Sequence, residues 1–140
     1  MLNAECWIKK VSANNSVFLK GFNLVKKYNP IVHTTKAFAV RIVKMYRYLC
    51  DEKKEYVLSK QVLRSVTSIG ANVKEAVRGQ SKADFYAKMN ISLKEASETE
   101  YWLELLYESN FIDKDSYYSI NSDCQEIMRL LTAICKTQKK

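Results

Sequence analysis

The sequence predicts an all-α protein in which residues 31–140 form an antiparallel, up-down-up-down four-helix bundle. Two observations support this fold class. The 140 residues include only 3 Gly and 1 Pro, so the turns that strands need are scarce. Beyond Pro30, apolar residues recur every three or four positions, the spacing of a helix with one buried face, in four long segments. Short polar connections between these segments favour antiparallel neighbours.

Residues 1–30 lack this periodicity, and we expect an N-terminal arm there with a short helix around residues 17–27. Asn29-Pro30 is typical of a turn, which would separate the arm from the bundle. The first residues do not have the pattern of a signal peptide. The chain also lacks an apolar run of the roughly 18 residues that a membrane span needs, so we expect a cytoplasmic protein with no membrane partner.

The first two helices are expected at residues 35–50 and 56–78. Thr34 or Thr35 would cap the first helix, because a hydroxyl oxygen can accept a hydrogen bond from a free backbone N–H. Gly79 would end the second helix in a left-handed conformation. The expected core positions are Phe38, Ala39, Ile42, Val43, Met45, Tyr46 and Leu49, then Leu58, Val62, Val66, Ile69, Val73, Ala76 and Val77.

The third and fourth helices are expected at residues 82–109 and 115–137. Ser81 and Asp84 have the spacing of a capping box at the start of the third helix, and Asn110 follows its end. The expected core positions are Phe85, Met89, Leu93, Ala96, Leu103 and Leu106, then Tyr117, Ile120, Cys124, Ile127, Met128, Leu131, Ile134 and Cys135.

A polar stripe runs beside the apolar stripe of the second helix. It carries short or amide-bearing side chains where a solvated face would normally carry Lys and Glu. Facing two glutamates of the third helix, these groups would form a structural polar network that fixes helix register. A ligand pocket and a simple solvated face are the alternatives. The predicted network comprises Gln61, Arg64, Ser68, Asn72, Glu75, Glu95 and Glu98.

The third helix carries a second apolar face, formed by Ile91, Trp102 and Leu105. A tryptophan outside the main core stripe indicates a surface covered by another subunit, so we expect a homo-oligomer. The alternative is a wide core stripe that lies under the N-terminal arm.

The net charge of +8 is unevenly distributed. Residues 1–54 contain 11 basic and 3 acidic side chains, whereas residues 81–110 contain 3 basic and 6 acidic ones. A concentrated basic surface suits an anionic partner, and a nearby aromatic ring allows base stacking. An ordinary solvated helix face is the alternative. The predicted contacts with RNA or DNA are Arg41, Lys44, Arg47, Tyr48, Lys53, Lys54 and Lys60.

Signals for catalysis or metal binding are weak. The four cysteines form no Cys-x-x-Cys pair, and His33 is the single histidine, so neither a zinc site nor a His-based nucleophile pair is expected. Glu75, Glu95 and Glu98 could converge, but a di-iron bundle also needs Glu-x-x-His motifs. We therefore expect no enzyme activity and no cofactor, with a metal- or small-molecule-binding bundle as a remote alternative.

Four motifs resemble the bacterial four-helix-bundle proteins, also called the 23S ribosomal RNA intervening-sequence protein family. They lie at residues 38–43, 56–76, 81–85 and 94–103, in order and with matching spacing, and the resemblance covers residues 31–138. It implies a left-handed bundle that assembles as a homopentamer, with no catalytic activity established for the family. The more distantly similar accessory variability determinant of diversity-generating retroelements implies a reverse transcriptase and nucleic acid as partners.

The sequence therefore predicts a non-enzymatic, oligomeric bundle that binds RNA or DNA, as an accessory to a ribonucleoprotein or a reverse transcriptase. A protein-binding scaffold, whose basic face meets an acidic partner, is the alternative function.

Overall fold

The computed structural model describes residues 29–139, and within them it contains four long α-helices and no strand. These are α3 (Pro30–Asp51), α4 (Leu58–Val77), α5 (Lys82–Glu108) and α6 (Lys114–Lys136). A 3-10 turn, η2 (Thr137–Lys139), follows α6. The predicted all-α class and the four helices are confirmed. The predicted arm lies outside the described residues, except for its last two.

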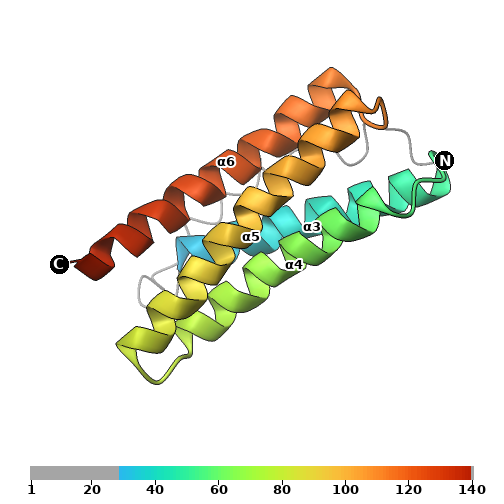
Figure 1. The fold of residues 1–140 in the computed structure, drawn as a ribbon. Coiled ribbons are helices and arrows are strands. Elements are labelled where there is room, and N and C mark those ends of the chain that lie inside the picture. Colours follow the sequence, from blue (N-terminus) through green and yellow to red (C-terminus); the bar gives the residue numbers. More distant parts are fainter. Residues whose placement is uncertain (1–28, 140) are drawn as a thin grey trace, which may run out of the picture.

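Consecutive helices run in opposite directions and are joined by short loops (Figure 1). The most extensive contact is between α4 and α5, followed by the contacts of α3 with α4 and of α5 with α6, and the contact between α3 and α6 is smaller. The α3–α4 and α5–α6 loops therefore lie at one end of the molecule. The α4–α5 turn and the start of α3 lie at the other end (Figure 1).

The interior is built from the predicted apolar stripes, with few exceptions. Val77 is 39% exposed, so its assignment to the core was wrong. The α5 stripe is wider than its apolar residues indicate, because Tyr86, Ser92 and Thr99 are also buried. The fully buried large side chains are Phe38, Ile42, Met45, Leu49, Val62, Ile69, Met89, Leu103, Leu106, Ile120, Ile127 and Leu131.

The first helix begins five residues earlier than predicted. Asn29 is its N-cap, and the Asn29 side chain accepts a hydrogen bond from the Ile31 N–H, while Pro30 occupies the first turn. Proline fits there because its missing N–H would have no partner in any case. Thr35 is not a cap but a buried residue whose hydroxyl donates to the Ile31 carbonyl at 2.8 Å. The sequence pair Asn29-Pro30 therefore starts a helix and does not form a separate turn.

Glu55 positions the start of α4, a role that the sequence analysis missed. Its carboxylate accepts hydrogen bonds from the N–H groups of Val57, Leu58 and Ser59 at 2.7 to 2.9 Å. At the other end of α4, the prediction of a left-handed Gly79 was wrong, because no described glycine has a positive φ. Gly79 instead gives space: a Cβ there would lie 2.6 Å from Asp84 Oδ2 and 3.2 Å from the Ala76 carbonyl oxygen.

The ends of the last two helices follow their sequence signals closely. The Ser81 hydroxyl accepts from the Asp84 N–H at 3.0 Å and starts α5, as predicted. Asn110 adopts φ 63° and ends α5 as predicted, with the Phe111 N–H bonded to the Leu106 carbonyl. Asp113 caps α6 by accepting from the Ser116 N–H at 2.7 Å.

Candidate nucleic-acid interface

Five of the predicted cations gather at one end of the molecule. Lys44 and Arg47 come from the second half of α3, Lys53 and Lys54 from the α3–α4 loop, and Lys60 from the first turn of α4. All five side chains are exposed, and none takes part in an ion pair between described residues. We call these five residues the basic end. Their charges are available to an anionic partner.

Arg41 was predicted as a phosphate contact, and this prediction was wrong. The residue is only 4% exposed. Its guanidinium forms an ion pair with Asp123 and donates to the Ser119 hydroxyl oxygen at 2.9 Å and to the Ser119 carbonyl. Arg41 lies on the flank of α3 that faces α6, and it holds these two helices together. A periodic pattern cannot reveal this, because Asp123 lies 82 residues away.

The aromatic ring that best suits base stacking is Tyr56 and not Tyr48. Tyr48 is half-buried and packs against the hydrophobic core, so part of its surface is already covered. Tyr56 is 57% exposed in the α3–α4 loop, close in sequence to Lys53, Lys54 and Lys60. A stacking platform needs an open ring face next to cations.

The charge asymmetry of the sequence becomes an asymmetry between two halves of the structure. Residues 29–80, which include α3 and α4, contain ten basic and four acidic side chains. Residues 81–139, which include α5 and α6, contain seven basic and ten acidic ones. The helices of each half are neighbours, so the molecule has a basic side and an acidic side.

Three of the predicted polar-network residues meet at Arg64. Its guanidinium forms ion pairs with Glu95, at 3.5 Å, and with Glu98, and its Nε donates to Gln61 Oε1 at 3.4 Å. The predicted partners are therefore correct. The predicted burial is not, because the Arg64 side chain is 50% exposed within one subunit. The cluster lies on the surface over the α4–α5 contact.

The other members of the predicted network form separate, local contacts. The Asn72 amide donates to the Ser68 carbonyl at 2.8 Å, one turn back on the same helix. Glu75 pairs with Lys88 at 3.1 Å and does not join the Arg64 cluster.

The buried hydrogen bonds between α4 and α5 come from smaller residues. Thr99 donates to the Ser65 hydroxyl oxygen at 2.8 Å, and Ser92 donates to the Ile69 carbonyl at 3.1 Å. Ser65 lies on the predicted polar stripe of the second helix, and Thr99 was expected to face it, but Ser92 was not predicted to take part. The signal for Ser92 was its spacing, because it lies three residues after Met89 and four before Ala96, on the buried face of α5.

The second apolar face of α5 is partly open. Ile91 is 42% exposed, whereas Trp102 and Leu105 are half-buried. The Trp102 ring packs against the core, and its indole N–H donates to Glu98 Oε1 at 3.0 Å. Ile91 is therefore the member of this face with the largest exposed fraction within one subunit.

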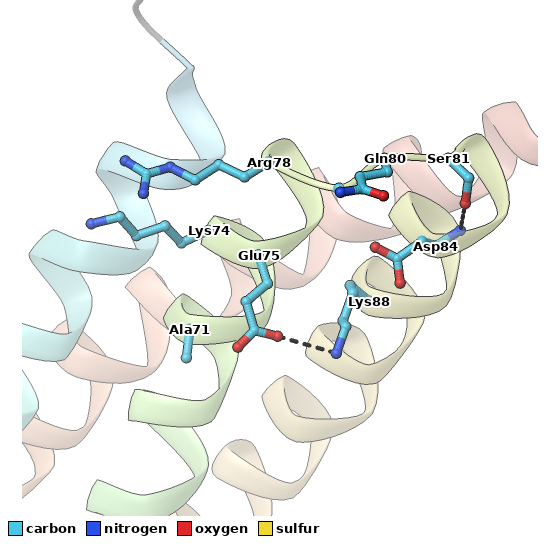
Figure 2. A pocket seen from close by; sticks show the side chains of 9 residues that line it. Ala71, Lys74, Glu75, Arg78, Gln80, Ser81, Asp84 and Lys88 are labelled. Atoms are coloured by element: carbon cyan, nitrogen blue, oxygen red, sulfur yellow. Dashed lines mark hydrogen bonds and ion pairs between the residues drawn. The ribbon is translucent and has the colours of Figure 1, made fainter.

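A groove of about 830 Å³ lies beside the α4–α5 turn (Figure 2). This turn is at the opposite end of the molecule from the α3–α4 loop (Figure 1). Lys74 and Glu75 of α4 and Arg78, which follows this helix, line one wall, and Asp84 and Lys88 of α5 line the other. Lys74 and Arg78 are exposed and take part in no ion pair of the described chain. No motif in the sequence marks these two cations as a site, because they are simply spread over the end of a helix.

The three cysteines of residues 29–139 differ in their burial. Cys124 is buried, and this burial raises the pKa of its thiol to about 12, which keeps it protonated at neutral pH. Cys50, Cys124 and Cys135 are free thiols. Residues 29–139 contain no group of three or more His, Cys, Asp or Glu side chains placed to hold a metal ion.

Among the described residues, no helix is both long and apolar enough to cross a membrane.

A solved structure closely similar to this fold is that of a protein with unknown function from the S23 ribosomal protein family of Bacteroides thetaiotaomicron. The two sequences are 56% identical, and the match covers 76% of this chain and 95% of the other, with a TM-score of 0.75. No functionally curated protein is similar enough to match the chain. The sequence model of the 23S rRNA-intervening sequence protein family matches residues 27–133, and the chain therefore belongs to that family.

Proposed function

We propose that this protein is a non-enzymatic, homo-oligomeric, up-down-up-down four-helix bundle that binds RNA or DNA through its basic end. The observation that carries the proposal is the set of five exposed cations, Lys44, Arg47, Lys53, Lys54 and Lys60, without ion-pair partners in the described chain. Unpaired lysine and arginine side chains exchange mobile counterions for phosphates, which gives sequence-independent binding. In this role the protein would be an accessory to a ribonucleoprotein or a reverse transcriptase.

Two further features support the basic end over a simple solvated surface. The exposed ring of Tyr56 lies in the same loop as Lys53 and Lys54, so cations and a stacking surface are combined. Several copies in one assembly would repeat the patch, and weak contacts to one polymer would then add up through avidity.

The first test is a salt titration of nucleic-acid binding. In the variant Lys44→Gln/Arg47→Gln/Lys60→Gln, three phosphate contacts are lost, so the log–log slope for a single strand should become shallower by roughly 2. The melting temperature should not change, because all three side chains are exposed and unpaired in the described chain. Fluorescence anisotropy with labelled single-stranded RNA, single-stranded DNA and a duplex measures the binding.

The matched control is Lys94→Gln/Lys114→Gln/Arg129→Gln, which removes the same charge from exposed positions of α5 and α6. It should keep the wild-type salt slope. An equally shallow salt slope in both variants would mean that only the net charge of the protein matters, which would contradict a defined binding end. No binding of any of the three probes at micromolar protein would favour the alternative function, a scaffold that meets an acidic protein.

A further inference from the structure

We propose that the groove beside the α4–α5 turn is a second phosphate-binding site, and that one nucleic-acid strand lies along the outer face of α4 between this groove and the basic end. The inference rests on the proposed function and adds the path of the strand. It assigns a role to Lys74 and Arg78, which the basic end does not include.

The two cations of the groove are arranged to act on one anion. Lys74 in the last turn of α4 and Arg78, the residue after its end, are four residues apart, and their side chains extend in the same direction, toward the beginning of α3 (Figure 2). Like charges at this spacing slightly destabilise an isolated helix. Both cations lie at the C-terminal end of α4, where the negative end of the helix dipole favours positive charge. An anion between them would relieve the remaining repulsion.

Both carboxylates of the groove lie away from these cations. Glu75 points to the α5 side, where its oxygen lies 3.1 Å from Lys88 Nζ, so its charge is neutralised (Figure 2). Asp84 lies on the α5 side of the groove, whereas the Lys74 and Arg78 side chains extend to the other side (Figure 2). Its carboxylate is next to Gly79, where an added Cβ would lie 2.6 Å from Asp84 Oδ2. The α5 wall is therefore mixed in charge, whereas the α3 side of the groove carries only the two unmatched cations.

Beside the outer face of α4 between the two sites, the carboxylates of Glu95 and Glu98 on α5 are paired with Arg64. The exposed positions after Lys60 are Arg64, Thr67 and Ala71, and no exposed carboxylate precedes Glu75 on this helix. Lys60 and Arg78 are eighteen residues apart, which corresponds to roughly 27 Å along a helix with a rise of about 1.5 Å per residue. A stacked strand with about 3.4 Å between phosphates would cover this distance with roughly eight nucleotides.

Strand length and salt dependence together test the path. Anisotropy titrations use fluorescent oligothymidylates of 4 and 12 nucleotides, because thymidylate does not form duplexes. The variant Lys74→Gln/Arg78→Gln should bind the 12-mer with a salt slope shallower by roughly 1.4, the value for two phosphates on a single strand. For the 12-mer, the ratio of the variant's dissociation constant to that of the wild type should therefore change by about sevenfold between 50 and 200 mM salt. Binding of the 4-mer should change by at most about twofold, because it reaches only one of the two sites.

The control Lys94→Gln/Arg129→Gln removes the same net charge from exposed positions of the acidic side and should keep the wild-type slope. A Lys74→Gln/Arg78→Gln variant that binds the 12-mer like this control would overturn the inference while leaving the basic end as the binding site. The inference would also be overturned if the wild-type affinities for the 4-mer and the 12-mer differed only because the 12-mer offers more positions at which one site can bind. Failure of wild-type protein to bind either length would instead refute the proposed function, and the inference with it.

Discussion

Two arginines that look alike in the sequence have opposite environments in the structure. Arg41 and Arg64 each lie within a helix, outside its apolar stripe. Arg41 is buried against α6 and paired with Asp123, whereas half of the Arg64 side chain remains in contact with solvent. Burial removes the screening by water, so the same type of ion pair has very different consequences when one partner is lost.

We expect Arg41→Ala to lower the free energy of unfolding by on the order of 3 kcal/mol, because it leaves Asp123 and the Ser119 oxygens without their partner. Arg64→Ala should cost less than about 1 kcal/mol, since its ion pairs are exposed. Urea melts of the two variants and the wild type measure both values. A loss for Arg64→Ala as large as that for Arg41→Ala would contradict the exposed environment and indicate that another subunit covers this surface.

At the scale of a helix, the ends are set by side chains that lie just outside the periodic segments. Asn29, Ser81 and Asp113 each accept a hydrogen bond from the first turn of the helix that follows. Glu55 does the same for α4 from further upstream, with three N–H donors. Burial acts to raise the pKa of Glu55, but these backbone hydrogen bonds outweigh it, and the net pKa is lowered.

We expect Glu55→Ala to cost about 1 kcal/mol at neutral pH, in the range measured for lost helix caps. A carboxyl group with a lowered pKa stabilises the fold above its unfolded pKa of about 4.3, and this contribution is lost as the pH falls through the folded value. The difference in unfolding free energy between wild type and Glu55→Gln should therefore be greatest near neutral pH and shrink below about pH 4. Urea melts at pH 7, 5 and 3 measure it, and a constant difference would show that the charge of Glu55 plays no part.

At the scale of the whole molecule, the basic end and the second apolar face of α5 lie on different helices. The cations of the basic end belong to α3, α4 and their connecting loop, whereas the open apolar position Ile91 belongs to α5. This separation would allow subunits to associate through α5 while the basic ends remain accessible. It is the physical reason for combining oligomerisation and nucleic-acid binding in one proposal.

We expect Ile91→Glu to weaken or abolish the proposed oligomer, because it places a charge on the apolar face of α5 without disturbing the core. Ile91 is a better test than Trp102, whose packing and hydrogen bond to Glu98 would be lost even in a single subunit. Multi-angle light scattering at micromolar concentration measures the mass. Val40→Glu, at an equally exposed apolar position on α3, is the control and should leave the mass unchanged. A monomeric wild-type protein would contradict the proposed assembly.

The sequence by itself determined the all-α class, the four helices and most of the core. Apolar spacing is a local property, so it identified Ile42, Val66, Met89 and Ile127 as buried without any knowledge of their partners. The end of α5 at Asn110 was also predictable, because a left-handed residue after a helix is encoded locally. The start of α3 was missed although Asn29-Pro30 carried the signal, since the same pair also suits a turn.

Only the tertiary structure decided which polar side chains are available at the surface. Arg41 does not belong to the basic end, because it is buried and paired with Asp123, which is far away in the sequence. Lys74 and Arg78 form no ion pair within the described residues, because Glu75, the acidic residue between them in the sequence, is paired with Lys88 of α5. Helical periodicity gives the angle of a side chain around its own axis, but the charge balance of a surface depends on what the next helix places there. Pairing between distant residues is therefore what separates structural cations from those free to bind a partner.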